Sequence, residues 1–128
     1  MELKEYFDTT SGYGILATAD ASGNVDAAMY AHPHFMEDDT LAFIMAERLT
    51  HANLQSNPKA VYLFIESGAG YTGRRLYLTK VREAEDDVLI SEICRRCDYS
   101  MHRDNLTRHV VFFKLERELP LVGPGNQI

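Results

Sequence analysis

Short runs in which hydrophobic and polar residues alternate make up most of the chain, and this period of two predicts β-strands. The clearest run covers residues 74–84, where Leu76 and Leu78 alternate with Tyr77 and Thr79. Residues 40–46 are almost entirely apolar, which predicts a strand that is buried on both faces. The pattern predicts six strands in all, at residues 13–19, 25–31, 40–46, 59–66, 74–84 and 109–116.

Three segments are predicted to be short helices, at residues 2–8, 50–57 and 86–97. In the first, Leu3, Tyr6 and Phe7 lie on one side of the helix. Thr50 is the predicted N-cap of the second, because its hydroxyl can accept a hydrogen bond from the first helical turn. That helix should end before Pro58, since the residue before a proline avoids the helical region.

The third predicted helix directs Val88, Leu89 and Ile93 toward the core. The C-terminal segment 120–125 is rich in proline and glycine, which predicts irregular structure. Most strands are separated by short turn clusters rather than by helices, so consecutive strands should form hairpins. The prediction is a mainly β protein with short helices, whose antiparallel sheet closes into a small barrel.

The length, charge and hydropathy of the chain limit the classes of protein to which it can belong. With 128 residues and 14.5 kDa it is predicted to be one domain, residues 1–128. A net charge of −6 argues against nucleic acid as a partner, because phosphate binding depends on a basic face. No apolar run is long enough to span a membrane. The charged start, residues 1–5, lacks a signal-peptide core, so a cytoplasmic location is expected.

The two cysteines, Cys94 and Cys97, form a single Cys-x-x-Cys pair. Asp98 follows, which argues against covalent haem attachment. A zinc site normally has four ligands, and His102 and His109 would complete such a set only with unusual spacing. The pair therefore has three possible roles: two inert thiols, two ligands of a metal ion, or a redox-active pair. No metal site is predicted from it.

The segment 43–58 carries the most chemical information, because a buried strand leads through a basic, hydroxyl-bearing turn into a helix. The N–H groups and positive dipole end of a helix suit a phosphate. Arg48 supplies a forked donor, Thr50 a hydroxyl and His51 a donor when it is protonated. The alternative is an ordinary strand–turn–helix in which Thr50 caps the helix and Arg48 lies in solvent.

In this segment the chain resembles a known family. The pattern Asn53-Leu54-x-x-Asn57-Pro58, followed by the strand at 60–64, is similar to the segment after the third strand of the pyridoxamine 5′-phosphate oxidase-like, flavin-binding split barrels. The order of elements agrees over residues 10–85. The resemblance implies a six-stranded antiparallel split β-barrel that forms a homodimer, with FMN in grooves between the subunits.

Carried onto this sequence, the resemblance implies a set of cofactor-binding residues. The end of the second strand lines the isoalloxazine ring, and the third strand flanks it. The turn and the following helix approach the ribityl phosphate. These residues are Met29, Tyr30, Ala31, Ile44, Met45, Ala46, Arg48, Thr50 and Asn53. Apart from the resemblance, the adjacent Arg74 and Arg75 follow the glycine loop and could bind a phosphate or carboxylate across a dimer interface. The alternative is that they are two solvated cations at a strand edge. Many relatives carry a lysine where this chain has Thr50, and Glu47 would oppose an anion beside it.

Two functional hypotheses follow. The first is an FMN-binding flavoprotein, an oxidoreductase that acts on an unidentified small molecule or redox partner, in which the cofactor supplies the chemistry. No catalytic side-chain arrangement stands out in the sequence, and this fits such a division of labour. The second is a non-catalytic split-barrel dimer that binds or senses haem or another planar ligand. Its motivation is the missing lysine together with the histidines His32, His34, His51 and His109.

Overall fold

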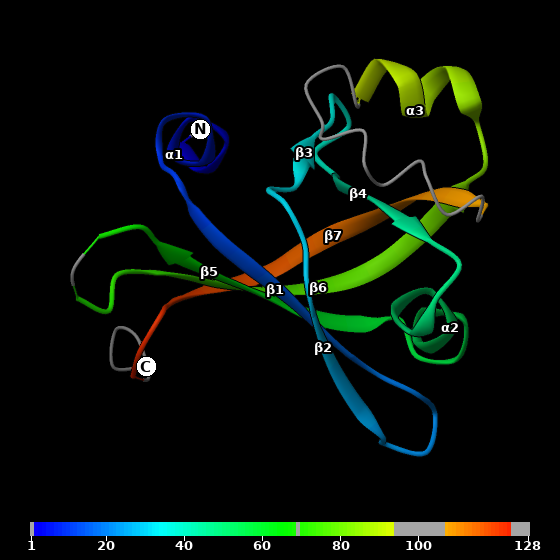
Figure 1. The fold of residues 1–128 in the computed structure, drawn as a ribbon, viewed down its shortest axis with the longest axis horizontal. Helices are drawn as coiled ribbons and strands as arrows, with labels where there is room; N and C mark the ends of the chain where they lie inside the picture. The colour runs from blue at the N-terminus through cyan, green and yellow to red at the C-terminus, as the bar shows by residue number, and fades with distance from the viewer. Residues whose placement is uncertain (1, 69, 94–106, 124–128) are drawn as a thin grey trace.

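A computed structural model describes residues 2–68, 70–93 and 107–123. Within them one seven-stranded antiparallel sheet is combined with three short helices (Figure 1). Along the sheet the strands follow the order β2-β1-β5-β6-β7-β4-β3. The helices are α1 (Glu2–Thr9), α2 (Leu49–Ser56) and α3 (Asp87–Ile93). The strands are β1 (Gly12–Ala19), β2 (Val25–Met29), β3 (His34–Phe35), β4 (Leu41–Ala46), β5 (Lys59–Glu66), β6 (Gly73–Ala84) and β7 (Arg108–Pro120).

The sheet is open, and this corrects the predicted closed barrel. Its two edges are β2 and β3, which the chain joins directly through residues 30–33 without pairing them in the part the structure describes. Pro33 lies in that connection and has no N–H to donate to a strand ladder. The sheet is therefore split at this point, as the family resemblance implies. It has seven strands rather than six, because β3 contains only two residues and is too short to show a period.

The interior of the sheet holds the main core. Alternate residues of the strands point inward, so their side chains form one cluster together with α1 and α2. Aromatic contacts dominate this cluster, for example Phe43 against Tyr62 at 5.1 Å between ring centroids and Phe7 against Phe64 at 4.9 Å. Figure 1 shows α1 and α2 at opposite ends of the sheet. Each end of the core is thus covered by a helix.

A second cluster lies between α3 and the outer side of β4 and β7. It contains Ala42 and Ile44 of β4, Val110 and Phe112 of β7, and Ile90 of α3. Since the other β4 side chains belong to the interior, this strand is buried on both faces, as predicted. The predicted inward face of α3 is partly wrong: Val88 is 69% exposed and Ile90 is the buried residue.

Tyr62 connects the segment 30–33, which joins β2 to β3, to the interior of the sheet. Its hydroxyl donates toward the carbonyl oxygens of Tyr30 and Ala31, at 3.3 and 2.9 Å. The ring lies against Gly14 of β1, where a Cβ would collide with the Tyr62 side chain. Glycine at this position therefore allows the aromatic ring to cross β1 and reach the segment that follows β2.

Several boundaries differ from the prediction. The helix α2 begins at Leu49 with Arg48 as its N-cap, so the prediction that Thr50 is the cap is wrong. The last strand continues to Pro120, which pairs with Arg74, so the irregular tail begins later than predicted. Cys94 and Cys97 lie outside the described residues. Among the residues described, no helix is long and apolar enough to cross a membrane.

Candidate functional site

The corner between β4 and α2 is the first part of the candidate site. The strand ends at Ala46, and Glu47, Arg48 and Leu49 form an exposed turn into the helix. The first turn of a helix leaves its N–H groups without partners inside the helix. The described structure shows no side-chain hydrogen bond from the N-cap residue Arg48 to this turn, and no acidic residue within it. The corner therefore offers N–H donors and a guanidinium to an anion.

Thr50 and Tyr30 connect this corner to the end of β2. The Thr50 side chain is buried and hydrogen-bonds with the Tyr30 side chain. Burial raises the pKa of the Tyr30 hydroxyl, while the Thr50 contact and the nearby Arg48 charge lower it in part. Tyr30 also packs edge-on against Phe43, with 6.0 Å between the ring centroids. Two predicted site residues thus lie together with Arg48, although Thr50 already has a partner within the chain.

Asn53 has an internal partner as well. Its buried amide donates to the hydroxyl of Thr18 in β1 at 3.0 Å, which fixes α2 against the sheet. The three predicted residues of β4 divide between the two sides of the sheet. Met45 points into the interior cluster and Ile44 lies under α3, while Ala46 is partly exposed at the strand end. The backbone of β4 continues directly into the α2 corner.

Met29, the last residue of β2, is 66% exposed on the outer side of the edge strand. Ala31 comes two residues later, and its carbonyl oxygen accepts the hydrogen bond from the Tyr62 hydroxyl. The contact between Tyr30 and Thr50 therefore links the end of β2, where Met29 lies, to the α2 corner. Whether these residues contact a ring ligand stays a prediction.

Arg74 and Arg75 lie elsewhere in the chain. They follow Gly73 at the start of β6, whereas the part of β6 near α2 is its other end, about 20–30 Å along an extended strand. Arg74 forms an ion pair with Glu118 at 2.9 Å and lies over the Tyr6 ring. Arg75 donates to the carbonyl oxygens of Pro120 and Gly123. The structure of the chain therefore does not bring these arginines to the α2 corner.

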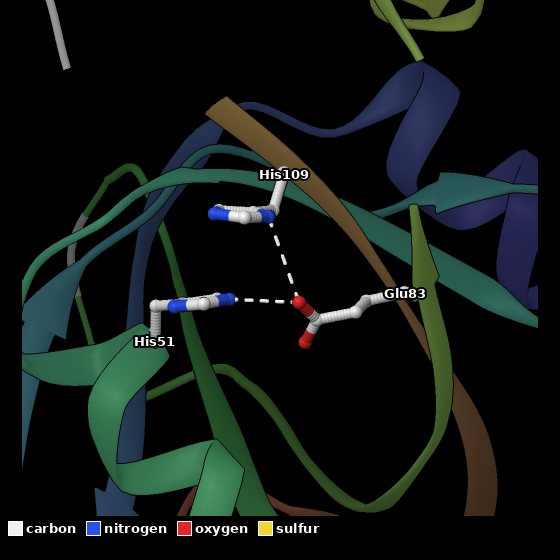
Figure 2. Close-up of side chains that lie close together, drawn as sticks. All are labelled: His51, Glu83 and His109. Atoms are coloured by element: carbon white, nitrogen blue, oxygen red, sulfur yellow. Dashed lines mark hydrogen bonds and ion pairs between the residues drawn. The ribbon is translucent and has the colours of Figure 1, made fainter. Parts of the chain in front are cut away.

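Next to the corner, three side chains from separate elements meet in what we name the His–Glu cluster: His51 of α2, Glu83 of β6 and His109 of β7 (Figure 2). His51 Nε2 lies 2.9 Å from Glu83 Oε2, and His109 Nδ1 lies 3.5 Å from the same oxygen. The two imidazole rings stack at 3.9 Å between centroids, with 12° between their planes. Both histidine side chains are about nine-tenths buried, at 11% and 8% exposed.

Three further polar side chains surround the cluster. Lys80 Nζ lies 2.8 Å from Glu83 Oε1, and Gln55 donates to the same oxygen at 3.0 Å. Glu47 Oε2 lies 3.1 Å from the outer ring nitrogen of His109, Nε2. Burial of Glu83 alone would raise its pKa. The hydrogen bonds from Lys80, Gln55 and His51 outweigh burial and lower the pKa to about 2, so Glu83 is ionised at neutral pH.

A β-bulge explains how Glu83 reaches this position. Strict alternation places Lys80 and Glu83 on opposite faces of β6, since they are three residues apart. The pairing with β7 shifts between Lys80 and Arg82, so that Val81 is an extra residue on β6. The extra residue reverses the alternation and directs both side chains to the same side. Sequence periodicity therefore does not predict that the Glu83 side chain belongs to this site. The one indication in the sequence is the four-residue spacing of His51 and Gln55, which places both side chains on one face of the helix.

The other histidines in the described structure lie near α1. The His32 ring packs against Phe7 and Phe64, with centroids 5.3 and 5.2 Å apart, and His34 lies in β3. Burial lowers the pKa of both side chains, and the charge of His32 lowers that of His34 further. These two residues are therefore separate from the His–Glu cluster.

Comparison with solved structures identifies the fold. An FMN-binding protein from Syntrophomonas wolfei superposes with a TM-score of 0.70, with 19% identity over 93% of this chain and 83% of that chain. A predicted pyridoxamine 5′-phosphate oxidase from Lactobacillus delbrueckii gives 0.66 and 17% identity over 93% and 92%. HutZ, the heme storage protein from Vibrio cholerae, gives 0.64 and 15% identity over 93% and 92%.

The chain has the split-barrel fold of these proteins. The resemblance drawn from the sequence is thus confirmed at the level of the fold. No family model matches the sequence, and no curated protein matches it.

Proposed function

We propose that this protein is an FMN-binding flavoprotein and an oxidoreductase of the pyridoxamine 5′-phosphate oxidase-like type. The observation that carries the proposal is the fold shared with an FMN-binding protein over nearly the whole chain. Bound FMN would supply the hydride or electron transfer, and the protein would bind and orient it. The substrate is an unidentified small molecule or redox partner, and the location is cytoplasmic.

The α2 corner fits the phosphate of FMN. It combines the exposed Arg48, the N–H groups of the first helical turn and the positive end of the helix dipole. Thr50 replaces the lysine that many relatives carry, and its hydroxyl is engaged with Tyr30. Arg48 is therefore the residue that we propose as the cation that binds the phosphate. Glu47 next to it opposes an anion, so phosphate affinity depends strongly on Arg48.

The outer face of β2, β1 and β5 supports the homodimer that this function requires. In the pairing between these strands, Ile15 lies between Met29 and Leu63, and Ala17 lies between Ala27 and Val61. The inward-pointing neighbours of these residues fill the core, so this apolar row faces outward. A contiguous apolar row on the outside of a sheet marks an interaction surface, and we assign it to a second copy of this chain. Arg74 and Arg75 would approach FMN only from that second subunit.

The second candidate function is binding of haem or another planar ligand without flavin chemistry. The observation that favours it is the fold shared with the heme storage protein HutZ. The two functions are separated by titrating the purified protein with FMN and, in parallel, with haemin. A saturable complex of one FMN per chain supports the flavoprotein. A saturable haem complex without FMN binding supports the alternative.

A further inference from the structure

The proposed flavin function does not use the side chains of Glu83 and His109, and the donor atoms of the His–Glu cluster point to a different ligand. We propose that His51, Glu83 and His109 bind a divalent transition-metal ion such as Zn²⁺. One ligand atom from each residue lies within 4.8 Å of the other two. Two imidazoles with one carboxylate favour a transition metal over Ca²⁺ or Mg²⁺, which prefer oxygen ligands.

The spacing of the donor atoms is suitable for one shared ion. Adjacent ligand atoms around a tetrahedral Zn²⁺ lie about 3.4 Å apart, given bonds of about 2.1 Å. The nitrogen atoms of His51 and His109 lie 2.9 and 3.5 Å from Glu83 Oε2. Figure 2 shows both rings presenting a nitrogen to this same oxygen. An ion at this edge of the stack requires the carboxylate to withdraw slightly and the two rings to tilt toward each other there.

The surroundings orient the donor atoms, and an ion that binds here would replace the hydrogen bond between His51 Nε2 and Glu83 Oε2, with release of the Nε2 proton to solvent. The outer nitrogen of His109 faces the Glu47 carboxylate at 3.1 Å, and a carboxylate on the far side of the ring is usual for metal-bound histidine. The Gln55 amide nitrogen lies 3.1 Å from the His51 carbonyl oxygen, 3.0 Å from Glu83 Oε1 and 3.2 Å from His51 Nε2. Lys80 also contacts Oε1, at 2.8 Å. Among these contacts only the two imidazole nitrogens face Glu83 Oε2, which is the carboxylate oxygen that the ion would share with them.

The local charge favours a cation. Glu47 and Glu83 are acidic and Glu85 lies within reach of His109, whereas Lys80 is the one lysine in contact with Glu83 among the described residues. With neutral imidazoles, the group therefore carries net negative charge, which a divalent ion would offset. Three protein ligands leave a fourth position for water or another small ligand, as in open zinc sites.

The test uses the full chain without an affinity tag, stripped of metal with EDTA and free of flavin. Calorimetric titration with ZnCl₂ is expected to show one site per chain, and Co²⁺ is expected to give the visible bands of a coordinated ion. His51→Ala and Glu83→Gln should each weaken Zn²⁺ binding by at least about tenfold. Glu47→Gln changes an exposed residue outside the coordination sphere and should weaken binding about 10- to 100-fold.

The control is the double variant Cys94→Ser/Cys97→Ser, which should bind Zn²⁺ as the wild type does. His34→Gln should likewise leave binding unchanged. Circular dichroism of each variant shows whether it has folded, and Glu47→Gln keeps the test decisive if a cluster variant does not fold. The proposal is overturned by absence of saturable binding. It is also overturned if binding survives His51→Ala, Glu83→Gln and Glu47→Gln but is lost in the cysteine variant.

Discussion

The side-chain amide of Asn53 in α2 donates to the hydroxyl of Thr18 in β1 at 3.0 Å, and both side chains are buried. This contact joins a residue of the Asn-Leu pattern to the strand on which the helix rests. It also shows that Asn53 holds α2 in place, independently of any ligand. The position of the α2 corner relative to the sheet thus depends on this hydrogen bond.

Removal of one partner should cost more than removal of both. Thr18→Val leaves the Asn53 amide buried without its acceptor, so the free energy of unfolding should fall by about 1–3 kcal/mol. In the double variant Thr18→Val/Asn53→Leu no buried donor is left unpaired, and part of the loss should be recovered. Urea unfolding of the three proteins measures this difference. Equal or additive losses would show that the hydrogen bond does not stabilise the fold.

The stability of the protein should fall as the pH drops below about 6.5, the ordinary value for histidine. The pKa of His34 is lowered by burial and by the charge of His32, so the unfolded chain takes up protons before the folded one. The free energy of unfolding is therefore lost as the pH falls from the unfolded pKa toward the lower folded pKa.

His34→Gln should reduce this pH-dependent loss, and His32→Gln should reduce it less because His32 is less deeply buried than His34. Urea unfolding at pH 7.5 and pH 5.5 measures the effect as the difference between the two conditions, about one pH unit on either side of the ordinary histidine pKa. Identical pH dependence in the wild type and His34→Gln would contradict this account.

Arg48→Ala should weaken FMN binding by about 10- to 100-fold, because it removes a charge-assisted hydrogen bond to the phosphate. Riboflavin, which lacks the phosphate, should bind the wild type and the variant equally. Lys4→Ala removes an exposed charge from α1, where Lys4 pairs with Asp8, and should leave both affinities unchanged. Quenching of flavin fluorescence measures these affinities. If FMN affinity is unchanged in Arg48→Ala, Arg48 does not bind the phosphate.

Ala17→Arg should convert the proposed dimer into a monomer. Ala17 lies in the middle of the outward apolar row, between Ala27 and Val61, where an arginine in each copy would place two buried charges together. Lys114→Glu changes the charge on the exposed side of β7 and should leave the dimer intact. Sedimentation velocity gives the mass of each protein. A wild-type monomer, or an intact dimer in Ala17→Arg, would contradict the proposed interface.

Much of the fold could be predicted because strand alternation and burial agree. The strand β5 has the bounds that its sequence indicates, and β4 is buried on both faces as its apolar run suggests. The short strand β3 was missed because two residues show no period. The helix α3 buries Ile90 instead of the predicted Val88, because a helix of seven residues is too short for its sequence to define the buried face.

The site was only partly predictable. The α2 corner lies within one continuous segment, so its residues could be recognised together. The His–Glu cluster draws on α2, β6 and β7, and its geometry depends on the bulge at Val81. Neither the pairing of distant strands nor a reversal of alternation within one strand can be read from local sequence patterns. Glu83 therefore became visible only in the structure.

The central claim is that this split barrel binds FMN. The most direct measurement is the visible absorption spectrum of the purified protein after mixing with FMN and removal of free FMN by desalting. The account predicts that the flavin bands are retained at one FMN per chain. A protein that is colourless after desalting, and that gives a Soret band when haemin is added instead, would contradict the flavoprotein and establish the haem-binding alternative.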